Sequence, residues 1–188
     1  MRLLPCLLFL SCPVPAAAQT YLADFLDALN RCQSSIETTT GFFDDGLERL
    51  DENSVAGQAN AELSSNVRDH RIWRFPSSPL QVTYSTYDRG GQLHSTCEVS
   101  LVKSATPLTS EQRASLLQSF THRMEQQIAD GTHERRDVIR IPPIVNLGYG
   151  PLERGIHGCR VMISLAFDPE SDFFSAGVGE QITHPCKD

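Results

Sequence analysis

The chain has 188 residues, with 16 Lys and Arg against 23 Asp and Glu, and a formal net charge of −7 at pH 7. An acidic chain without a run of basic residues is poorly suited to bind nucleic acid or an anionic lipid surface. We therefore look for a partner among other proteins and small ligands.

The N-terminus has the layout of a secretory signal peptide over residues 1–18. Arg2 precedes a short apolar run, and Ala16 and Ala18 fit the A-x-A cleavage pattern. The run is shorter than the roughly 20 apolar residues that span a bilayer, so we expect no membrane insertion after cleavage. Two alternatives stay open, an uncleaved membrane anchor and a lipoprotein acylated at Cys12.

Four cysteines remain after cleavage, Cys32, Cys97, Cys159 and Cys186. An even number in an exported chain predicts two disulfides, in one of three connectivities. The absence of a C-x-x-C sequence argues against a thioredoxin-type redox site and against a zinc knuckle. We prefer Cys32–Cys97 with Cys159–Cys186, because a last strand that folds back would return Cys186 to Cys159.

The mature chain, residues 19–188, is expected to form one domain that opens with an amphipathic helix. Its apolar stripe has i, i+3, i+4, i+7 spacing and consists of Leu22, Phe25, Leu26, Leu29 and Cys32. A second short helix is predicted over Phe42–Leu50, followed by a surface connection over Glu52–Asp69. A strand over Arg71–Phe75 then carries Trp73, which we expect to pack in the core or at a sheet edge.

The clearest local pattern is a β-hairpin over Leu80–Leu101. Two alternating runs are separated by a turn whose Gly90 and Gly91 can adopt positive φ. In the second run the predicted core face consists of Leu93, Ser95, Cys97, Val99 and Leu101.

A second long helix follows the hairpin. Thr109 and Gln112 have the spacing of a capping box, and Gly131 ends the helix. Its apolar stripe consists of Leu117, Phe120, Met124 and Ile128. After it we interpret Gly148–Pro151 as a turn, Cys159–Phe167 as a central strand covered on both faces, and Phe173–Thr183 as the last strand.

Parts of the two halves resemble each other in order. Ile72–Pro76 resembles Val138–Pro142, the Asp88–Gly91 turn resembles Glu153–Gly155, and His94–Val99 resembles His157–Val161. We infer two related helix-plus-three-strand units, 20–102 and 108–184. The alternative is chance, because strands and turns use few residue types. The predicted fold class is α+β, an antiparallel sheet with two main helices packed on it.

The sequence contains no recognisable catalytic, metal-binding or cofactor-binding motif. A G-x-S-x-G elbow, a phosphate-binding glycine loop and H-x-x-x-H spacing are all missing. The best ligand-site candidates are His94 and His157, which occupy equivalent places in the two units, and Arg89 and Arg154 at the paired turns. The simpler interpretation, which we favour, is that the histidines face solvent. We interpret Arg135, Arg136 and Arg140 in the same way, as a solvated face.

Three features together resemble small uncharacterised exported proteins of Gram-negative bacteria. They are the Ala16–Gln19 leader end, the early helix with Cys32, and hairpins that end in Cys-x-Val at Cys97 and Cys159. The resemblance covers the layout of the chain and implies a periplasmic or secreted location. The partner is expected to be an envelope protein or a small ligand.

The predicted function is a binding or protein-interaction module without a cofactor. One alternative is a small hydrolase or metal-dependent enzyme whose site is assembled from scattered residues such as His94 and His157. Another is an inhibitor or immunity-like protein that covers a partner enzyme through an exposed apolar patch.

Overall fold

A computed structural model describes residues 16–38, 41–51, 67–102, 108–155, 158–169, 171 and 173–181, without the side chains of residues 16–20 and 89. The signal peptide prediction falls mainly on residues outside these ranges, as do His157 and Cys186. Among the described residues, no helix is both long and apolar enough to cross a membrane.

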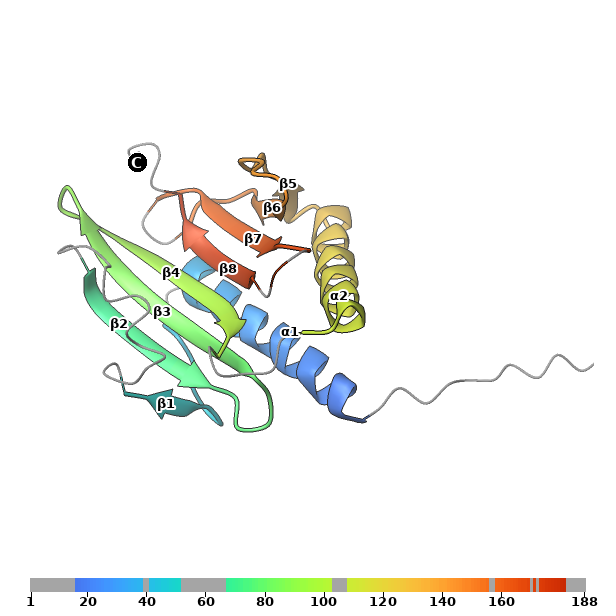
Figure 1. The fold of residues 1–188 in the computed structure, drawn as a ribbon. Coiled ribbons are helices and arrows are strands. Elements are labelled where there is room, and N and C mark those ends of the chain that lie inside the picture. Colours follow the sequence, from blue (N-terminus) through green and yellow to red (C-terminus); the bar gives the residue numbers. More distant parts are fainter. Residues whose placement is uncertain are drawn as a thin grey trace, which may run out of the picture.

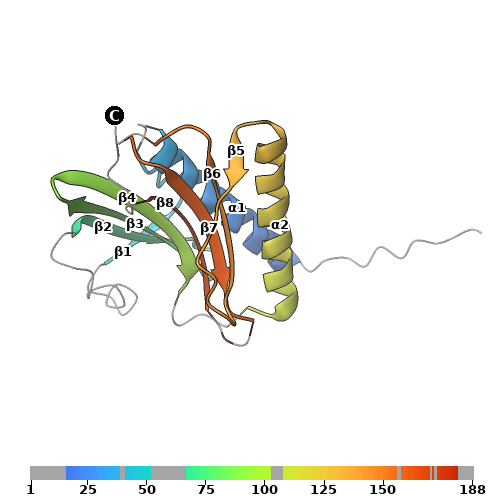
Figure 2. The same ribbon diagram turned by 90° about the horizontal axis from the view of Figure 1, so that it is seen from above.

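The fold is α+β, with two helices packed on one eight-stranded antiparallel sheet (Figures 1 and 2). Across the sheet the order is β1-β2-β3-β4-β8-β7-β6-β5. In chain order the elements are α1 (Ala16–Glu37), β1 (Glu48–Leu50), β2 (Val67–Arg74), β3 (Leu80–Arg89), β4 (Gln92–Leu101), α2 (Ser110–Ala129), β5 (His133–Arg135), β6 (Val145–Pro151), β7 (Val161–Phe167) and β8 (Phe174–Glu180). This confirms the predicted fold class.

The order of strands is symmetric about the β4–β8 pair at the centre of the sheet. A helix followed by four strands occurs twice, and in chain order each set of strands runs from an outer edge of the sheet to its centre. The residue similarities follow a different correspondence, since they place β4 opposite the start of β7, whereas the strand order places β4 opposite β8. The duplication of 20–102 and 108–184 therefore stays a prediction.

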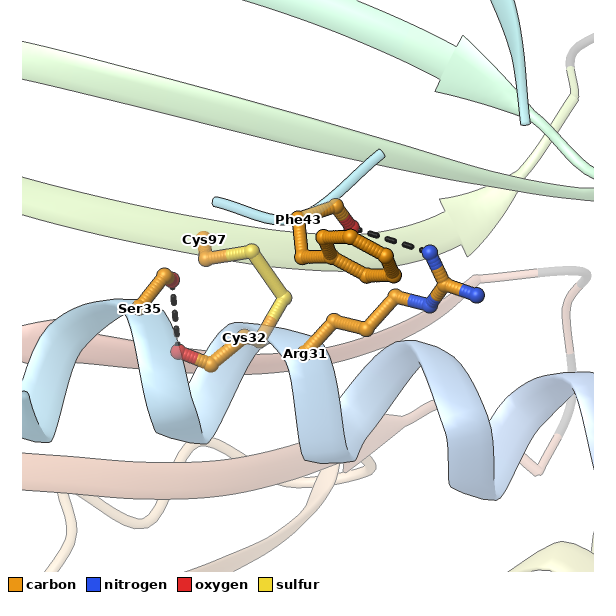
Figure 3. Close-up of a disulfide and its surroundings, with 5 residues drawn as sticks. All are labelled: Arg31, Cys32, Ser35, Phe43 and Cys97. Carbon is orange, nitrogen blue, oxygen red and sulfur yellow. Dashed lines mark hydrogen bonds between the residues drawn. A yellow bond between two sulfur atoms is a disulfide. The ribbon is translucent and has the colours of Figure 1, made fainter. Parts of the chain in front are cut away.

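Helix α1 lies across the middle of the sheet and supplies much of the core. Phe25, Leu29 and Cys32 are fully buried, as the apolar stripe predicted. Cys32 forms a disulfide with Cys97 of β4, with an S–S distance of 2.06 Å (Figure 3). The helix is thereby bonded covalently to a central strand, which confirms this half of the predicted pairing and makes the domain disulfide-stabilised.

The β3–β4 hairpin confirms the strongest sequence prediction. Arg89 pairs with Gln92, and the turn residues Gly90 and Gly91 have φ of +64° and +85°, values that glycine adopts without strain. On the core face Ser95, Cys97 and Val99 are buried, whereas Leu93, beside the turn, is 46% exposed.

Helix α2 begins and ends where the sequence predicts. Thr109 and Gln112 form both bonds of the capping box, and Gly131 follows the helix with φ of +70°. Its buried residues are Leu116, Phe120 and Met124, while Leu117 and Ile128 are partly buried against the core. Both helices pack against the same apolar cluster, on one face of the sheet.

Three local predictions are wrong. Phe42–Leu50 is not a helix, because Phe42 stacks on Trp73 with ring centroids 4.6 Å apart and the chain then continues as β1 beside β2. Gly148–Pro151 is part of β6 and not a turn. Val138–Pro142 lies outside the strands, although its similarity to Ile72–Pro76 predicted one. In the first two cases pairing with distant residues overrides the local pattern.

Candidate functional site at the α2–β6 edge

His94 does not face solvent, contrary to the interpretation that we favoured. It is 3% exposed, and its Nδ1 lies 3.6 Å from Sγ of Cys159. The local alternation of β4 places His94 opposite the core face, but Cys159, from the segment before β7, covers it. The sequence around His94 does not indicate this burial, because the covering residue lies more than sixty positions away in the chain.

His94, Cys159 and Glu180 offer ligand atoms within 4.8 Å of one another. A cysteine binds a metal through its thiolate, however, and Cys159 is disulfide-bonded. Oε2 of Glu180 accepts a hydrogen bond of 3.1 Å from the backbone N–H of Ser95. We therefore interpret this cluster as a structural link between β4 and β8, and not as a metal centre.

The other predicted site residues are not brought together in the part of the chain that is described. Arg154 donates from Nη1 to the carbonyl of Gly158, within its own turn, at 2.7 Å. His157 and the side chain of Arg89 lie outside the described residues, so a paired-histidine site stays a prediction. The same holds for Cys186 as the disulfide partner of Cys159.

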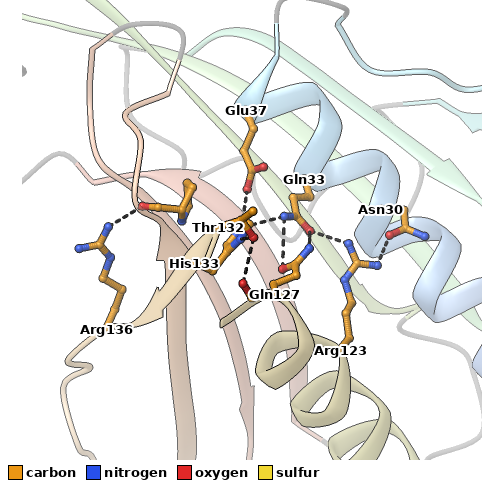
Figure 4. Close-up of polar contacts among 9 residues, drawn as sticks. Asn30, Gln33, Glu37, Arg123, Gln127, Thr132, His133 and Arg136 are labelled. Atoms are coloured by element: carbon orange, nitrogen blue, oxygen red, sulfur yellow. Dashed lines mark hydrogen bonds and ion pairs between the residues drawn. The ribbon is translucent and has the colours of Figure 1, made fainter. Parts of the chain in front are cut away.

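A polar network joins α1, α2 and β5 around the buried His133 (Figure 4). Oε1 of Gln33 accepts from Nη2 of Arg123 at 2.5 Å, so its amide nitrogen points to Nε2 of His133 at 3.0 Å. Nε2 of His133 also lies 3.3 Å from Oε1 of Glu37, and its Nδ1 lies 2.9 Å from Oγ1 of Thr132. The ring of His133 thus joins two side chains of α1 to Thr132, just after α2.

Arg123 of α2 donates to Gln33 of α1, and no carboxylate among the described residues pairs with it. It also donates to the side chain of Asn30. Burial lowers the pKa of the Arg123 guanidinium, and the negative charge of Glu37 acts in the opposite direction. Because the pKa of arginine lies far above neutrality, the group stays charged and fastens α2 to α1. The network positions β5 and contributes to the fold.

A cavity of about 430 Å³ lies beside this network, at the edge of the sheet. Helix α2 contributes Thr121, the end of β5 and the segment after it contribute a row of mostly charged residues, and β6 contributes four residues from Asn146 to Tyr149. The lining residues are Thr121, Arg135, Arg136, Asp137, Val138, Arg140, Asn146, Leu147, Gly148 and Tyr149. Arg135 and Arg140 are exposed, as the interpretation as a solvated face expected, whereas Arg136 is half-buried, and all three line this cavity.

Two of the three arginines already have carboxylate partners. Arg135 pairs with Glu125 at 2.7 Å, and Arg136 pairs with Glu134. Arg140 is exposed and has no hydrogen bond or ion pair with any residue that the structure describes. It is the cation of this cavity that is available to a ligand.

The first half of β6 has no strand on its outer side in the described part of the chain. Strand β5 pairs only with Tyr149–Pro151, and the N–H of Arg136 donates to the carbonyl of Gly148 at 2.9 Å. In an antiparallel strand the backbone groups of alternate residues point to the same side. The N–H and C=O of Asn146 therefore point toward the cavity, as the N–H of Gly148 does.

Two large apolar side chains stand exposed on the segment that flanks the cavity. Ile139 is 78% exposed and Ile141 is 57% exposed, on either side of Arg140. Val138–Ile141 together with Val145–Gly148 is called the open edge below. The two prolines of the Ile-Pro-Pro-Ile sequence were a usable signal, because proline cannot donate in a strand ladder and keeps this segment out of the sheet.

Comparisons with known proteins add no information about this site. No family model, no curated protein sequence and no solved structure matches this chain.

Proposed function

We propose that this protein is an exported, disulfide-stabilised binding module whose partner docks on the open edge. The observation that carries the proposal is a cavity of about 430 Å³ that combines the unpaired Arg140, backbone groups of β6 and the exposed Ile139 and Ile141. Exposed apolar side chains beside a charged group that needs a counterion are typical of an interaction surface.

Export is supported by the cysteines and by the leader-like N-terminus. Cys32–Cys97 is a buried disulfide, and disulfides persist in oxidising compartments such as the periplasm. Fractionation of expressing cells, followed by the mass of alkylated but unreduced protein, tests this part. Recovery of Cys32 and Cys97 as free thiols from correctly fractionated cells would contradict it.

The enzyme alternative has less support from the described residues. Its best metal candidate uses Cys159, whose sulfur is bonded in a disulfide. An inhibitor or immunity-like protein is a special case of the binding proposal, in which the partner is an enzyme.

The docking proposal is tested by a photo-crosslinking residue placed at Ile139, in protein exported by the source cells. Leu93 is a matched control, because it is also an exposed apolar side chain but lies beside the β3–β4 turn. We expect a defined crosslinked product from position 139 and none from position 93. Equal labelling from both positions, or none from either, would contradict the open edge as the binding surface.

A further inference from the structure

We propose that the open edge binds an extended peptide that carries a carboxylate side chain, and that the peptide adds as a further strand beside the first half of β6. This inference rests on the proposed binding function and names its ligand class. Addition of a strand to a free sheet edge is a common mode of peptide recognition, because the main chain supplies affinity and alternate side chains supply specificity.

The backbone of β6 provides the first part of the site. Asn146 and Gly148 line the cavity, and the outward N–H and C=O of Asn146 and the outward N–H of the buried Gly148 have no strand partner among the residues described, whereas the C=O of Gly148 accepts from Arg136. The side-chain amide of Asn146 is engaged elsewhere, since its Nδ2 donates to the carbonyl of Ile139 at 3.3 Å. The main chain of β6 is therefore the group left to pair with a ligand.

The room along β6 fits a short peptide. Residues Val145 to Leu147 pair with β7 on one side only, since the N–H of Arg136 already donates to Gly148 and β5 begins to pair at Tyr149. A strand advances about 3.3 Å per residue, so this stretch accepts about three residues of an added strand.

Arg140 determines the charge of the ligand. Its guanidinium is exposed, lines the cavity and lacks a carboxylate partner within the described chain, whereas Arg135 and Arg136 are already paired. Arginine binds a carboxylate through two parallel hydrogen bonds. An acidic side chain on the added strand would pair with Arg140 in a cavity whose own lining holds three arginines and one carboxylate, Asp137.

Ile139 and Ile141 determine the neighbours of that acidic residue. Both side chains are mostly exposed and flank Arg140 in the chain. A peptide with β-branched residues on either side of its acid would cover them and remove apolar area from water. The predicted ligand is thus a short extended segment of the type apolar-acidic-apolar, presented by an envelope protein.

Four probes test the inference. They are the blocked peptide acetyl-Ser-Val-Glu-Ile-Ser-amide, the same peptide with Gln in place of Glu, the Glu peptide with N-methylated backbone amides, and free glutarate. Binding is measured by amide chemical shifts of the ¹⁵N-labelled protein. We expect the Glu peptide to shift the amides of Asn146 and Gly148, and N-methylation to abolish binding because it removes the strand donors.

Two matched variants locate the charge. Arg140→Gln should weaken the Glu peptide about tenfold and leave the Gln peptide unchanged. Arg49→Gln, on β1 at the opposite edge of the sheet, should leave both affinities unchanged. Equal weakening of both peptides by Arg140→Gln would overturn the assignment of the carboxylate to Arg140.

Other outcomes identify a different occupant or none. If glutarate or the N-methylated peptide binds as well as the Glu peptide, the site takes an anion without strand addition. If the free protein dimerises in sedimentation and the Asn146 and Gly148 shifts follow protein concentration, the occupant is a second copy. If no probe binds while Ile139 still crosslinks a partner, this inference fails and the proposed function stands; if neither occurs, both fail.

Discussion

The two outer edges of the sheet are built from similar strands but differ in how the large side chains beside those strands are packed. Each ends in a three-residue strand rich in charged residues, β1 on one side and β5 on the other. Beside β1, Phe42 stacks on Trp73, and Nε1 of Trp73 donates to Asp44 at 3.0 Å. We call this the closed edge. At the open edge the corresponding large side chains, Ile139 and Ile141, stand in solvent.

The arginines of the two edges differ in the same way, because Arg74 and Arg31 at the closed edge have partners and Arg140 at the open edge has none among the described residues. At the closed edge Arg74 makes two hydrogen bonds to Glu48, of 2.9 and 3.0 Å, and Arg31 lies 5.4 Å from the ring centroid of the exposed Phe43. At the open edge Arg140 has no such partner among the described residues. Short charged edge strands prevent unwanted sheet pairing. In both cases the edge strand pairs with only part of the next strand, Ile72–Arg74 of β2 and Tyr149–Pro151 of β6. The edges therefore differ in their side chains, which are packed and paired beside β1 and exposed at Ile139, Arg140 and Ile141.

The largest effect should come from the disulfide that lies between the two edges. Replacement of Cys32 and Cys97 by serine removes a crosslink between residues 65 positions apart and should lower the free energy of unfolding by about 4 kcal/mol. Urea denaturation measures this change. The fraction of the double variant that stays folded should still bind the Glu peptide. If a fully folded double variant does not bind the peptide, the open edge depends on the crosslink.

At the closed edge, Trp73→Ala should lower the free energy of unfolding by about 3 kcal/mol, because Trp73 is 1% exposed and its loss leaves a cavity under Phe42. The matched change at the open edge is Ile139→Ala, which should alter stability by less than about 0.5 kcal/mol. Thermal and urea unfolding measure both. A loss above about 1 kcal/mol for Ile139→Ala would mean that this side chain packs in the fold and is not kept for a partner.

Gly148→Ala should damage the open edge itself. A Cβ at this position would lie 2.3 Å from Cγ1 of Val138 and 3.1 Å from the carbonyl oxygen of Arg136, so the segment after β5 must move. We expect a loss of about 2 kcal/mol in stability and weaker binding of the Glu peptide. Gly91→Ala provides a contrast, because it meets no atom within 4 Å and acts only through its positive φ. Unchanged peptide affinity in Gly148→Ala would contradict the location of the site.

Much of this fold could be predicted from sequence because the signals are local. Gly90 and Gly91 between alternating runs define the β3–β4 hairpin, and Thr109 with Gln112 defines the start of α2. The disulfide between Cys32 and Cys97 was one of the two bridges that we preferred for the four cysteines of the mature chain. These features depend on neighbours in the chain or on cysteine chemistry.

The parts that were missed depend on contacts between distant segments. The apolar spacing of Phe42–Leu50 fits a helix, but its aromatic ring belongs against Trp73. His94 has the alternation of a solvated position and is covered by Cys159. The cavity around Arg140 exists only once α2 and β6 meet the segment after β5, so the sequence showed its arginines without showing their concave arrangement.

The smallest effect concerns the charges beside the closed edge. The hydrogen bond from Arg71 lowers the pKa of Asp69 below its usual range. A carboxyl with a lowered pKa in the folded state contributes stability above its unfolded pKa of about 4, and the contribution disappears as the pH falls through the folded value. The difference in stability between the wild type and Arg71→Gln should therefore be constant above about pH 5 and vanish in acid. A difference that persists in acid would assign it to packing of the Arg71 side chain.

Hydrogen exchange at the amides of Asn146 and Gly148 tests the central claim most directly, with and without the Glu peptide. In the free protein the amide of Asn146 should exchange quickly, because it faces the cavity without a strand partner, and that of the buried Gly148 more slowly, whereas the amide of Val82, in the middle of the paired strand β3, should be protected most. Saturation with the peptide should slow exchange at Asn146 and Gly148 and leave Val82 unchanged. Protection of both amides in the free protein, or no change on saturation, would contradict the open edge as a strand-binding site.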